Sequence, residues 1–397
     1  MSAGDTRIVA AKHRDLLSAA LAFEDPSAFR VKSWGELLRA LGIFHFCSFP
    51  VLVNNCGKLM SIARTLLGKR GFSLLLRPTV YAQFVAGENE REISQSIEKM
   101  SLLGLRPMLA VPIEEDLGES TGEKRYDDNM EAMLECVRMS HSKAWSKDPM
   151  MQLKITALLS PELCVKLTTL TAQRPCDLDL LVRGMNGEPI SFPGLNENEV
   201  AHFQCGLKRL NKIAEESRSL LLEALRLCKS EDFCLGVKLV RGAYMDKERK
   251  LAEKKGRPDP IYQCWEDTND SYNGSLNVML EIIAQKPEHY RIIIATHNEE
   301  SVRRAAKRME ELRIDKDGGS VCFGQLLGMC DHVSLTLAKE GYAVYKSVPY
   351  GSVDDTLPYL VRRAQENRTV LQGIRKERDL LKQELSRRLR LSLRGSS

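Results

Sequence analysis

The run Arg291-Ile-Ile-Ile-Ala-Thr-His-Asn298 joins a short apolar stretch to the start of a helical one. Its four consecutive apolar residues are typical of a strand in a parallel sheet, where both faces are covered. The residues that follow, 299–312, repeat apolar side chains at helical spacing. Because a strand that passes directly into a helix is the unit of a mostly parallel sheet, this run predicts an α/β fold.

The same alternation of strand and helix recurs from residue 104 onward. The predicted strands are 107–113, 153–159, 236–240, 291–296, 320–326 and 343–348, and the predicted helices are 128–145, 197–229, 270–285, 299–312, 331–339 and 353–371. The Gly-x-Gly-x-x-Gly fingerprint of a doubly wound dinucleotide-binding fold is absent from the sequence. We therefore expect a (β/α) barrel, although a complete one has eight strands and six are recognisable.

The two missing strands belong between residues 160 and 235. That stretch contains a polar segment with Pro and Gly (174–194) and then one long helical pattern, with only 177–183 as a weak strand candidate. We expect an incomplete barrel over 72–371, preceded by a helical arm over 1–71 and followed by a basic helical tail over 372–397.

Composition and charge narrow the class of protein. A hydrophobic content of 43% supplies a substantial core, and the net charge of +5 requires no nucleic acid partner. The 11 cysteines are odd in number and contain no C-x-x-C pair, which fits neither a zinc site nor a disulfide framework. The cysteines therefore favour a reducing compartment and no metal site.

The two ends of the chain raise the question of targeting and membrane contact. The first twenty residues are basic and loosely resemble a mitochondrial targeting segment, with a plain helical arm as the alternative. The most apolar early stretch, 42–53, is too short to span a bilayer. The tail 367–397 has nine basic and three acidic residues with leucines near helical spacing. It is interpreted as an amphipathic helix that either packs on the barrel or lies on a membrane surface.

Polar residues at the predicted strand ends are the first candidates for an active site, because barrel enzymes place their chemistry there. Lys154 lies in the apolar run Leu153-Lys-Ile-Thr156, and a lysine that faces the barrel interior needs an anion. An outward orientation toward a covering helix is equally open. Arg241 ends its strand, and Gly242 and Ala243 leave room for a close approach to the backbone. An ordinary turn is the alternative for this segment.

Two further groups carry candidate chemistry. Thr296, His297 and Asn298 open a helix, where free N–H groups favour a phosphate, although such residues also serve as plain helix caps. In Arg362-Arg363-Ala-Gln-Glu366, two adjacent guanidinium groups suit a carboxylate. The alternative is a solvent-exposed pair between Arg362 and Glu366, worth roughly a few tenths of a kcal/mol.

Taken together, these segments resemble the proline dehydrogenase family, in order and spacing, from about residue 72 to the end. The matching motifs are Arg77-Pro-Thr-Val-Tyr-Ala-Gln-Phe84, Met151-Gln-Leu-Lys-Ile-Thr-Ala157, Gly236-Val-Lys-Leu-Val-Arg-Gly-Ala-Tyr244, Ala295-Thr-His-Asn298, Phe323-Gly-Gln-Leu-Leu-Gly-Met329, Tyr345-Lys-Ser-Val-Pro-Tyr-Gly351 and Tyr359-Leu-Val-Arg-Arg-Ala-Gln-Glu366. The resemblance implies a distorted (β/α)8 barrel that binds FAD, oxidises an imino acid at the ring carbon beside nitrogen, and passes electrons to a quinone. It also implies a mitochondrial enzyme at the matrix side of the inner membrane, in peripheral contact with it.

The resemblance also assigns roles to residues. Arg362 and Arg363 would hold the substrate carboxylate, supported by Lys154, while Glu366 would pair with Arg362 and help place the ring nitrogen. Leu326 would pack on the substrate ring. For the flavin, the implied contacts are Arg241 at its redox-active part, Gly242 and Ala243 nearby, and Thr296, His297 and Asn298 toward the rest of the cofactor.

Ser347 points to one branch of the family. True proline dehydrogenases usually carry a tyrosine at this position, and serine makes room for the hydroxyl group of trans-4-hydroxy-L-proline. The resemblance is therefore closest to the hydroxyproline-oxidising branch, with L-proline oxidation as the alternative.

Two family motifs are missing between Lys154 and Gly236, an Asp-Ala-Glu and a Thr-Tyr-Gln that each end a strand. This departure leaves a catalytically inactive, shortened form as a further hypothesis. A Schiff-base aldolase barrel that uses Lys154 is a third possibility.

Overall fold

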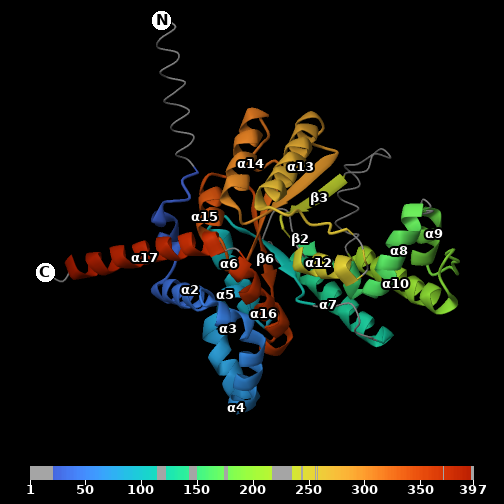
Figure 1. Ribbon diagram of the computed structural model, residues 1–397, viewed down its shortest axis with the longest axis horizontal. Coiled ribbons are helices and arrows are strands. Elements are labelled where there is room, and N and C mark those ends of the chain that lie inside the picture. Colours follow the sequence, from blue (N-terminus) through green and yellow to red (C-terminus); the bar gives the residue numbers. More distant parts are fainter. Residues whose placement is uncertain are drawn as a thin grey trace, which may run out of the picture.

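Six parallel strands form the centre of the fold (Figure 1). The computed structural model describes residues 21–113, 122–142, 150–173, 178–216, 235–242, 245–254, 256, 258–369 and 371–394. The strands are β1 (Arg106–Ala110), β2 (Met150–Gln152), β3 (Leu235–Val240), β4 (Tyr290–Ala295), β5 (Val321–Leu326) and β6 (Val344–Pro349). The predicted α/β fold with six strands is confirmed.

The order of the strands is that of a barrel with a gap. The sheet runs β2-β1-β6-β5-β4-β3, so the first strand pairs with the last, with Leu109 opposite Val348. Such a pairing of first and last strands curls a sheet toward closure. Within the described residues β2 and β3 are not paired with each other, and each ends the sheet. The fold is therefore a curled, incompletely closed barrel, open between β2 and β3.

Helices occupy the described part of the chain between β2 and β3. They are η3 (Ile155–Ala157), α8 (Pro161–Gln173), α9 (Leu178–Met185) and α10 (Glu197–Glu216). Residues 174–177 and 217–234 lie outside the described residues, so the last part of the predicted helix 197–229 does too.

Two predictions in this region are wrong. The segment 153–159, predicted as a strand, follows β2 instead of forming it. The strand β2 ends at Gln152, because its neighbour β1 ends at Ala110, directly opposite Gln152. The candidate strand 177–183, within the segment interpreted as a polar loop, falls mostly on helix α9. There Leu180 and Leu181 pack on a small core around Ile190, because the same apolar residues fit helical spacing as well as alternation.

Helices that follow the strands cover the outside of the sheet. They are α7 (Glu123–Ser142), α12 (Met245–Lys254), α13 (Trp265–Gln285), α14 (Glu299–Glu311), α15 (Asp331–Lys339) and α16 (Val353–Thr369), while α6 (Glu90–Leu102) precedes β1. Leu276, Leu280 and Ile283 of α13 belong to the main core together with Ile292 and Ile294 of β4. Five of these helices, α7, α13, α14, α15 and α16, lie close to the predicted ranges, whereas α6 and α12 were not predicted.

The two ends of the described chain pack on each other. The N-terminal part consists of η1 (Pro26–Val31), α2 (Trp34–Cys47), α3 (Pro50–Asn54), α4 (Cys56–Leu76), η2 (Arg77–Tyr81) and α5 (Ala82–Phe84), and the last helix is α17 (Leu371–Arg394). Arg388 of α17 donates to the carbonyl oxygens of Phe29, Arg30 and Lys32 at 2.8–3.2 Å. The tail therefore packs on the N-terminal elements rather than extending alone.

The described helices do not combine the length and the apolar composition that a bilayer-spanning helix needs. The first twenty residues, on which the targeting prediction rests, lie outside the described residues.

Gly328, just after β5, provides a test of how closely the N-terminal arm packs on the barrel. Its φ is +75°, and a Cβ there would lie 2.0 Å from the carbonyl oxygen of Gln83. We expect Gly328→Ala to lower the free energy of unfolding by about 3 kcal/mol, since it combines backbone strain with a clash against rigid backbone.

The matched control is Gly341→Ala, because Gly341 has a similar φ of +83° but no atom near its missing Cβ. That variant should lose only about 1 kcal/mol. Urea unfolding of both variants measures the difference, and equal losses would contradict the close approach of Gln83.

Candidate active site at the strand ends

The carboxyl ends of the six strands meet at one mouth of the open barrel. Ala110 is opposite both Gln152 and Pro349, and Leu326 is opposite Ser347. On the other side, Val240 is opposite Ala295. Residues that end or follow these strands are therefore neighbours across the mouth.

Lys154 lies at this mouth, on the side of β2 and β1. It precedes the short helix η3, and its Nζ donates to the carbonyl oxygen of Ile113 at 2.7 Å. Ile113 follows the end of β1. The lysine thus reaches to the segment that follows the neighbouring strand.

Ser347 of β6 has a partner that the sequence analysis did not identify. Gln152 Nε2 donates to Ser347 Oγ at 2.8 Å, across β1, which lies between the two strands. Because Ser347 Oγ accepts this bond, its own hydrogen is free to be donated to another group. Gln152 was missed because the predicted strand began one residue too late, at 153.

Lys346, next to Ser347, is the centre of a buried charge cluster. Its side chain is 1% exposed, and its Nζ donates to Asp331 Oδ1 at 2.9 Å and to the carbonyl oxygens of Leu326 and Met329 at 3.2 and 2.8 Å. Lys32 forms a second ion pair with Asp331 at 2.7 Å. Burial alone would raise the pKa of Asp331, but these two ammonium groups hold it well below its usual range.

The C-terminal helix contributes to the same cluster through Glu377. Its carboxylate accepts the backbone N–H groups of Cys330 and Asp331 at 2.9 and 2.8 Å. These donors stand at the start of α15, where an acidic group is favoured. Burial raises the pKa of Glu377. The loop after β5 is therefore held in place by both ends of the chain.

His297 connects the end of β4 with that of β5. Its Nε2 accepts the backbone N–H of Leu326 at 3.2 Å, which requires an unprotonated Nε2. Burial, followed by the charges of Lys346 and Arg363, lowers the pKa of His297 to about 3. The imidazole is therefore neutral, and the guanidinium of Arg363 lies near enough to influence it.

The neighbours of His297 shape the start of α14. Asn298 Oδ1 accepts the N–H of Ser301 at 2.8 Å, and Thr296 Oγ1 accepts the N–H of Asn298 at 3.0 Å. Asn298 is thus the N-cap of the helix, as the plainer interpretation of this triplet holds.

Arg241 follows β3 and packs against helix α13. Its guanidinium stacks on the ring of Trp265 at 4.9 Å and donates to Asn269. Burial lowers the pKa of Arg241, and its Nε is buried with no hydrogen-bond partner in the described part of the chain. Gly242 follows with φ of +67°, and Ala243 lies outside the described residues.

Arg362 and Arg363 lie on α16, the helix that follows β6. Arg363 is 6% exposed, and its guanidinium stacks on the ring of Tyr359 at 4.8 Å. The positive charge of Arg363 also contributes to the lowered pKa of His297. The side chain of Glu366 lies outside the described residues, so its predicted pairing with Arg362 stays a prediction.

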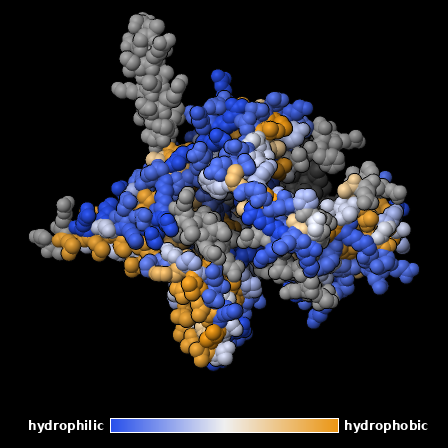
Figure 2. Space-filling model, viewed as in Figure 1, coloured by the Kyte–Doolittle hydropathy of each residue, from blue (hydrophilic) through white to orange (hydrophobic). Residues whose placement is uncertain are grey.

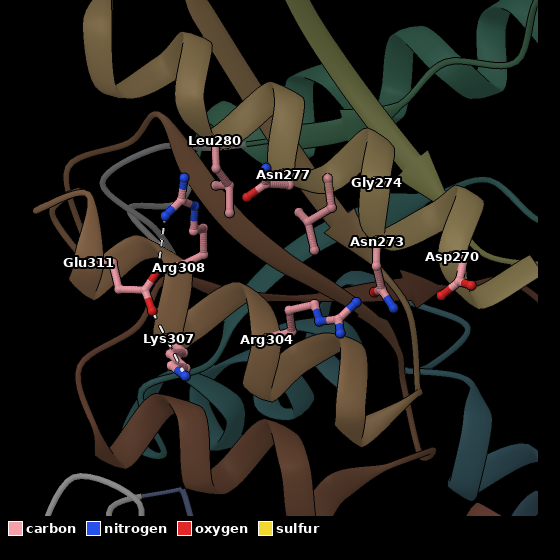
Figure 3. A pocket seen from close by; sticks show the side chains of 10 residues that line it. Asp270, Asn273, Gly274, Asn277, Leu280, Arg304, Lys307, Arg308 and Glu311 are labelled. Atoms are coloured by element: carbon pink, nitrogen blue, oxygen red, sulfur yellow. Dashed lines mark hydrogen bonds and ion pairs between the residues drawn. The ribbon is translucent and has the colours of Figure 1, made fainter. Parts of the chain in front are cut away.

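A separate hollow lies away from this mouth, between helices α13 and α14 (Figure 3). Its volume is about 520 Å³. The charged groups along it are largely paired with one another, as Arg308 is with Glu281 and Glu311. None of the predicted site residues lines it, so it is distinct from the candidate active site.

The comparisons with known proteins agree with one another. A family model described as proline dehydrogenase matches residues 214–376. Hydroxyproline dehydrogenase from Xenopus laevis is 48% identical, with 93% of this chain and 91% of the relative covered. The human hydroxyproline dehydrogenase is 41% identical, with 92% of this chain and 93% of the relative covered. The chain belongs to the proline dehydrogenase family.

More distant members of the proline dehydrogenase family match as well. Proline dehydrogenase 1, mitochondrial, from Drosophila melanogaster is 27% identical, with 93% of this chain and 81% of the relative covered. Among solved structures, proline utilization A (PutA) from Bdellovibrio bacteriovorus has a TM-score of 0.51 at 20% identity, which supports the fold. The match covers 84% of this chain and 36% of that longer protein.

The alignment with the Xenopus relative also bears on the gap in the barrel. It extends over 425 positions, more than the 397 residues of this chain. The relative therefore contains residues, inside the aligned region, that this chain lacks. The open sheet between β2 and β3 is consistent with their loss there.

The neutral state of His297 predicts a pH dependence of stability. The folded chain resists protonation of His297 down to about pH 3, whereas in the unfolded chain the group titrates near its ordinary value of 6.5. The contribution of neutral His297 to the free energy of unfolding is therefore fully present above pH 6.5 and is lost as the pH falls toward 3. Between pH 7 and 5 the loss should be roughly 1 to 2 kcal/mol.

His297→Asn removes this titration and should flatten that part of the profile. Urea unfolding of both proteins at pH 7 and pH 5 measures the effect, since the two proteins share every other titratable group. An identical fall in stability in the variant would show that His297 is not held neutral.

Proposed function

We propose that this chain oxidises trans-4-hydroxy-L-proline to 1-pyrroline-3-hydroxy-5-carboxylate and passes the electrons through FAD to a quinone. The hydroxyproline dehydrogenases among its relatives support the substrate. The observation that carries the proposal in this chain is the small hydroxyl side chain of Ser347 at the mouth, held by Gln152 at 2.8 Å. It leaves space for a substrate hydroxyl and offers it a hydrogen-bond donor.

The cationic side chains at the mouth fit the other end of the substrate. Arg362 and Arg363 from α16 would clamp the carboxylate, with Lys154 supporting it from the opposite side. The buried stacking of Arg363 on Tyr359 limits its rotamers, which favours a fixed clamp. Leu326 would pack on the ring, and its position is set by the backbone bond to His297.

The residues present fit FAD in part. The buried Nε of Arg241 has no hydrogen-bond partner in the described residues. Its N–H can therefore donate to an acceptor atom of the cofactor without breaking an existing hydrogen bond. Arg241, Gly242 and Ala243 would lie at the redox-active part of the flavin, and Thr296, His297 and Asn298 toward the rest of it. Bound FAD would supply the acceptor for the hydride equivalent removed from the ring carbon.

The protein itself would act mainly by positioning. A carboxylate fixed by two guanidinium groups, with the ring against Leu326, leaves one orientation for the reacting carbon. Because His297 is neutral, it adds no further positive charge beside Lys346 and Arg363. Glu366 would pair with Arg362 and help to place the ring nitrogen.

The proposed setting is the mitochondrion, at the matrix side of the inner membrane, in peripheral contact with it. The relatives that are named mitochondrial proline dehydrogenase support the compartment. The first twenty residues, with Arg7, Lys12 and Arg14 against Asp5 and Asp15, loosely resemble a targeting segment.

A direct test is to purify the chain with added FAD and record its absorbance before and after anaerobic addition of trans-4-hydroxy-L-proline. We expect a stoichiometric flavin band that is bleached by the substrate. Arg363→Met should lower kcat/KM by at least about a hundredfold while the flavin band stays, since its charged hydrogen bonds to the carboxylate are lost. Turnover that is unchanged in this variant would contradict the clamp.

The specificity prediction concerns Ser347→Tyr. A tyrosine fills the space beside Gln152, so kcat/KM for hydroxyproline should fall more than kcat/KM for proline, with a change in their ratio of roughly 10- to 200-fold. Steady-state kinetics on both substrates measures this ratio. Equal losses on the two substrates would refute the role of Ser347 and leave L-proline oxidation as the better assignment.

A second candidate is a catalytically inactive form of the family. The observation that favours it is the pair of sheet edges at β2 and β3, where a closed barrel would have further strands. A folded protein that shows no flavin absorbance after incubation with excess FAD and removal of the unbound cofactor would establish this alternative.

A further inference from the structure

Helix α4 projects from the body of the protein and exposes apolar side chains along its middle. It is anchored at its two ends, where Cys56, Phe72 and Leu76 are buried. No residue between Cys56 and Phe72 is buried. Figure 1 shows α4 as a protrusion at the lower end of the molecule, and Figure 2 shows hydrophobic residues gathered over it.

The exposed apolar residues of this protrusion are large. Leu66 is 79% exposed and Leu74 is 77% exposed. The others on the same helix are Leu59, Ile62, Leu67 and Leu75. A helical break at Gly68, with φ of 64° and ψ of 170°, turns the chain in the middle of this group. Soluble surfaces rarely gather this many leucines, so the protrusion indicates an interaction site.

The charge of the surrounding chain identifies the kind of partner. From residue 37 to residue 87 the sequence contains no aspartate or glutamate, although the whole chain has 53 of them. The protrusion itself carries Lys58, Arg64, Lys69 and Arg70, all exposed. Asp354 of α16 pairs with Arg64 and Lys69 at 3.1 and 3.0 Å. This single carboxylate offsets only part of the positive charge, so the protrusion stays basic.

We infer that the exposed middle of α4, residues 57–71 with Leu74 and Leu75, binds the surface of an anionic lipid bilayer. Leucines inserted at the boundary of the acyl chains and basic groups at the headgroups are the two contributions that hold a peripheral helix on such a surface. A second copy of this chain is a poorer occupant, because a symmetric contact would bring two basic protrusions together.

The position of α4 relates its contact with the bilayer to the candidate active site. Its base packs on α16, where Cys56 Sγ donates to the carbonyl oxygen of Val361 at 3.8 Å. Val361 directly precedes the arginine pair of the candidate site. A bilayer held by α4 would therefore lie near the barrel mouth, where a lipid-soluble quinone could approach; this last step rests on the proposed function.

The test is flotation of the purified full chain with vesicles of phosphatidylcholine, with and without phosphatidylglycerol. We expect binding to the anionic vesicles only, and its loss in Leu66→Asp/Leu74→Asp. The control is Leu102→Asp/Val278→Asp, which places the same charges on exposed apolar positions of α6 and α13 and should still float. Equal loss in both double variants would overturn the inference.

The basic residues are tested separately. Lys69→Gln/Arg70→Gln should weaken binding to anionic vesicles by about thirtyfold, as expected for two cations near the surface. Lys250→Gln/Lys254→Gln removes the same charge from α12 and should change binding little. Equal binding to neutral vesicles would contradict the role of the basic residues and of anionic lipid. A change in oligomeric state alone, measured by sedimentation of the α4 variants, would contradict a lipid partner.

Flotation needs no turnover, so it separates this inference from the proposed function. With a soluble electron acceptor, the α4 variants should oxidise hydroxyproline as the unmodified chain does. Flotation without any turnover would support the membrane-binding surface and reject the proposed activity. Turnover without flotation would support the proposed activity and reject the membrane-binding surface.

Discussion

The buried ammonium group of Lys346 is the constraint on which much of the structure depends. A lysine that is removed from water requires compensation at each of its donors, and here it meets two carbonyl oxygens and Asp331. Asp331 in turn binds Lys32 from the N-terminal arm, while Glu377 from the last helix holds the same loop. One charge in β6 thus brings the arm, the loop after β5 and the tail together beside the candidate site.

The sequence predicts the parts of the fold that depend on local pattern. The apolar run at 291–296 locates β4 within a residue, and the helix predicted at 331–339 coincides with α15, because these elements have a clear local pattern of apolar residues. The three-residue strand β2 has too few residues to show alternation, so its limits were misplaced and Gln152 was overlooked. In the sequence, Lys346 interrupts an apolar run as conspicuously as Lys154 does. Its partners come from distant segments that no local pattern connects.

The open barrel leaves the two sides of the candidate site unequally supported. The side of the mouth formed by β4, β5, β6 and α16 contains paired or stacked residues, as His297 and Arg363 show. On the other side, β3 pairs only with β4 among the described strands, and Arg241 contacts Trp265 and Asn269 of α13. The residues proposed to bind the substrate carboxylate are therefore better supported by their surroundings than those proposed to bind the flavin.

The pairing of the first strand with the last has a consequence for biosynthesis. Lys32 and Asp331 are 299 residues apart, and β1 finds its partner β6 only when nearly all of the chain exists. At the usual rate of translation, Asp331 is synthesised roughly 15 to 60 s after Lys32. During that time one edge of β1 and the apolar side of the arm have no final partner. The nascent chain therefore depends on chaperones for longer than a protein of this size built from local contacts.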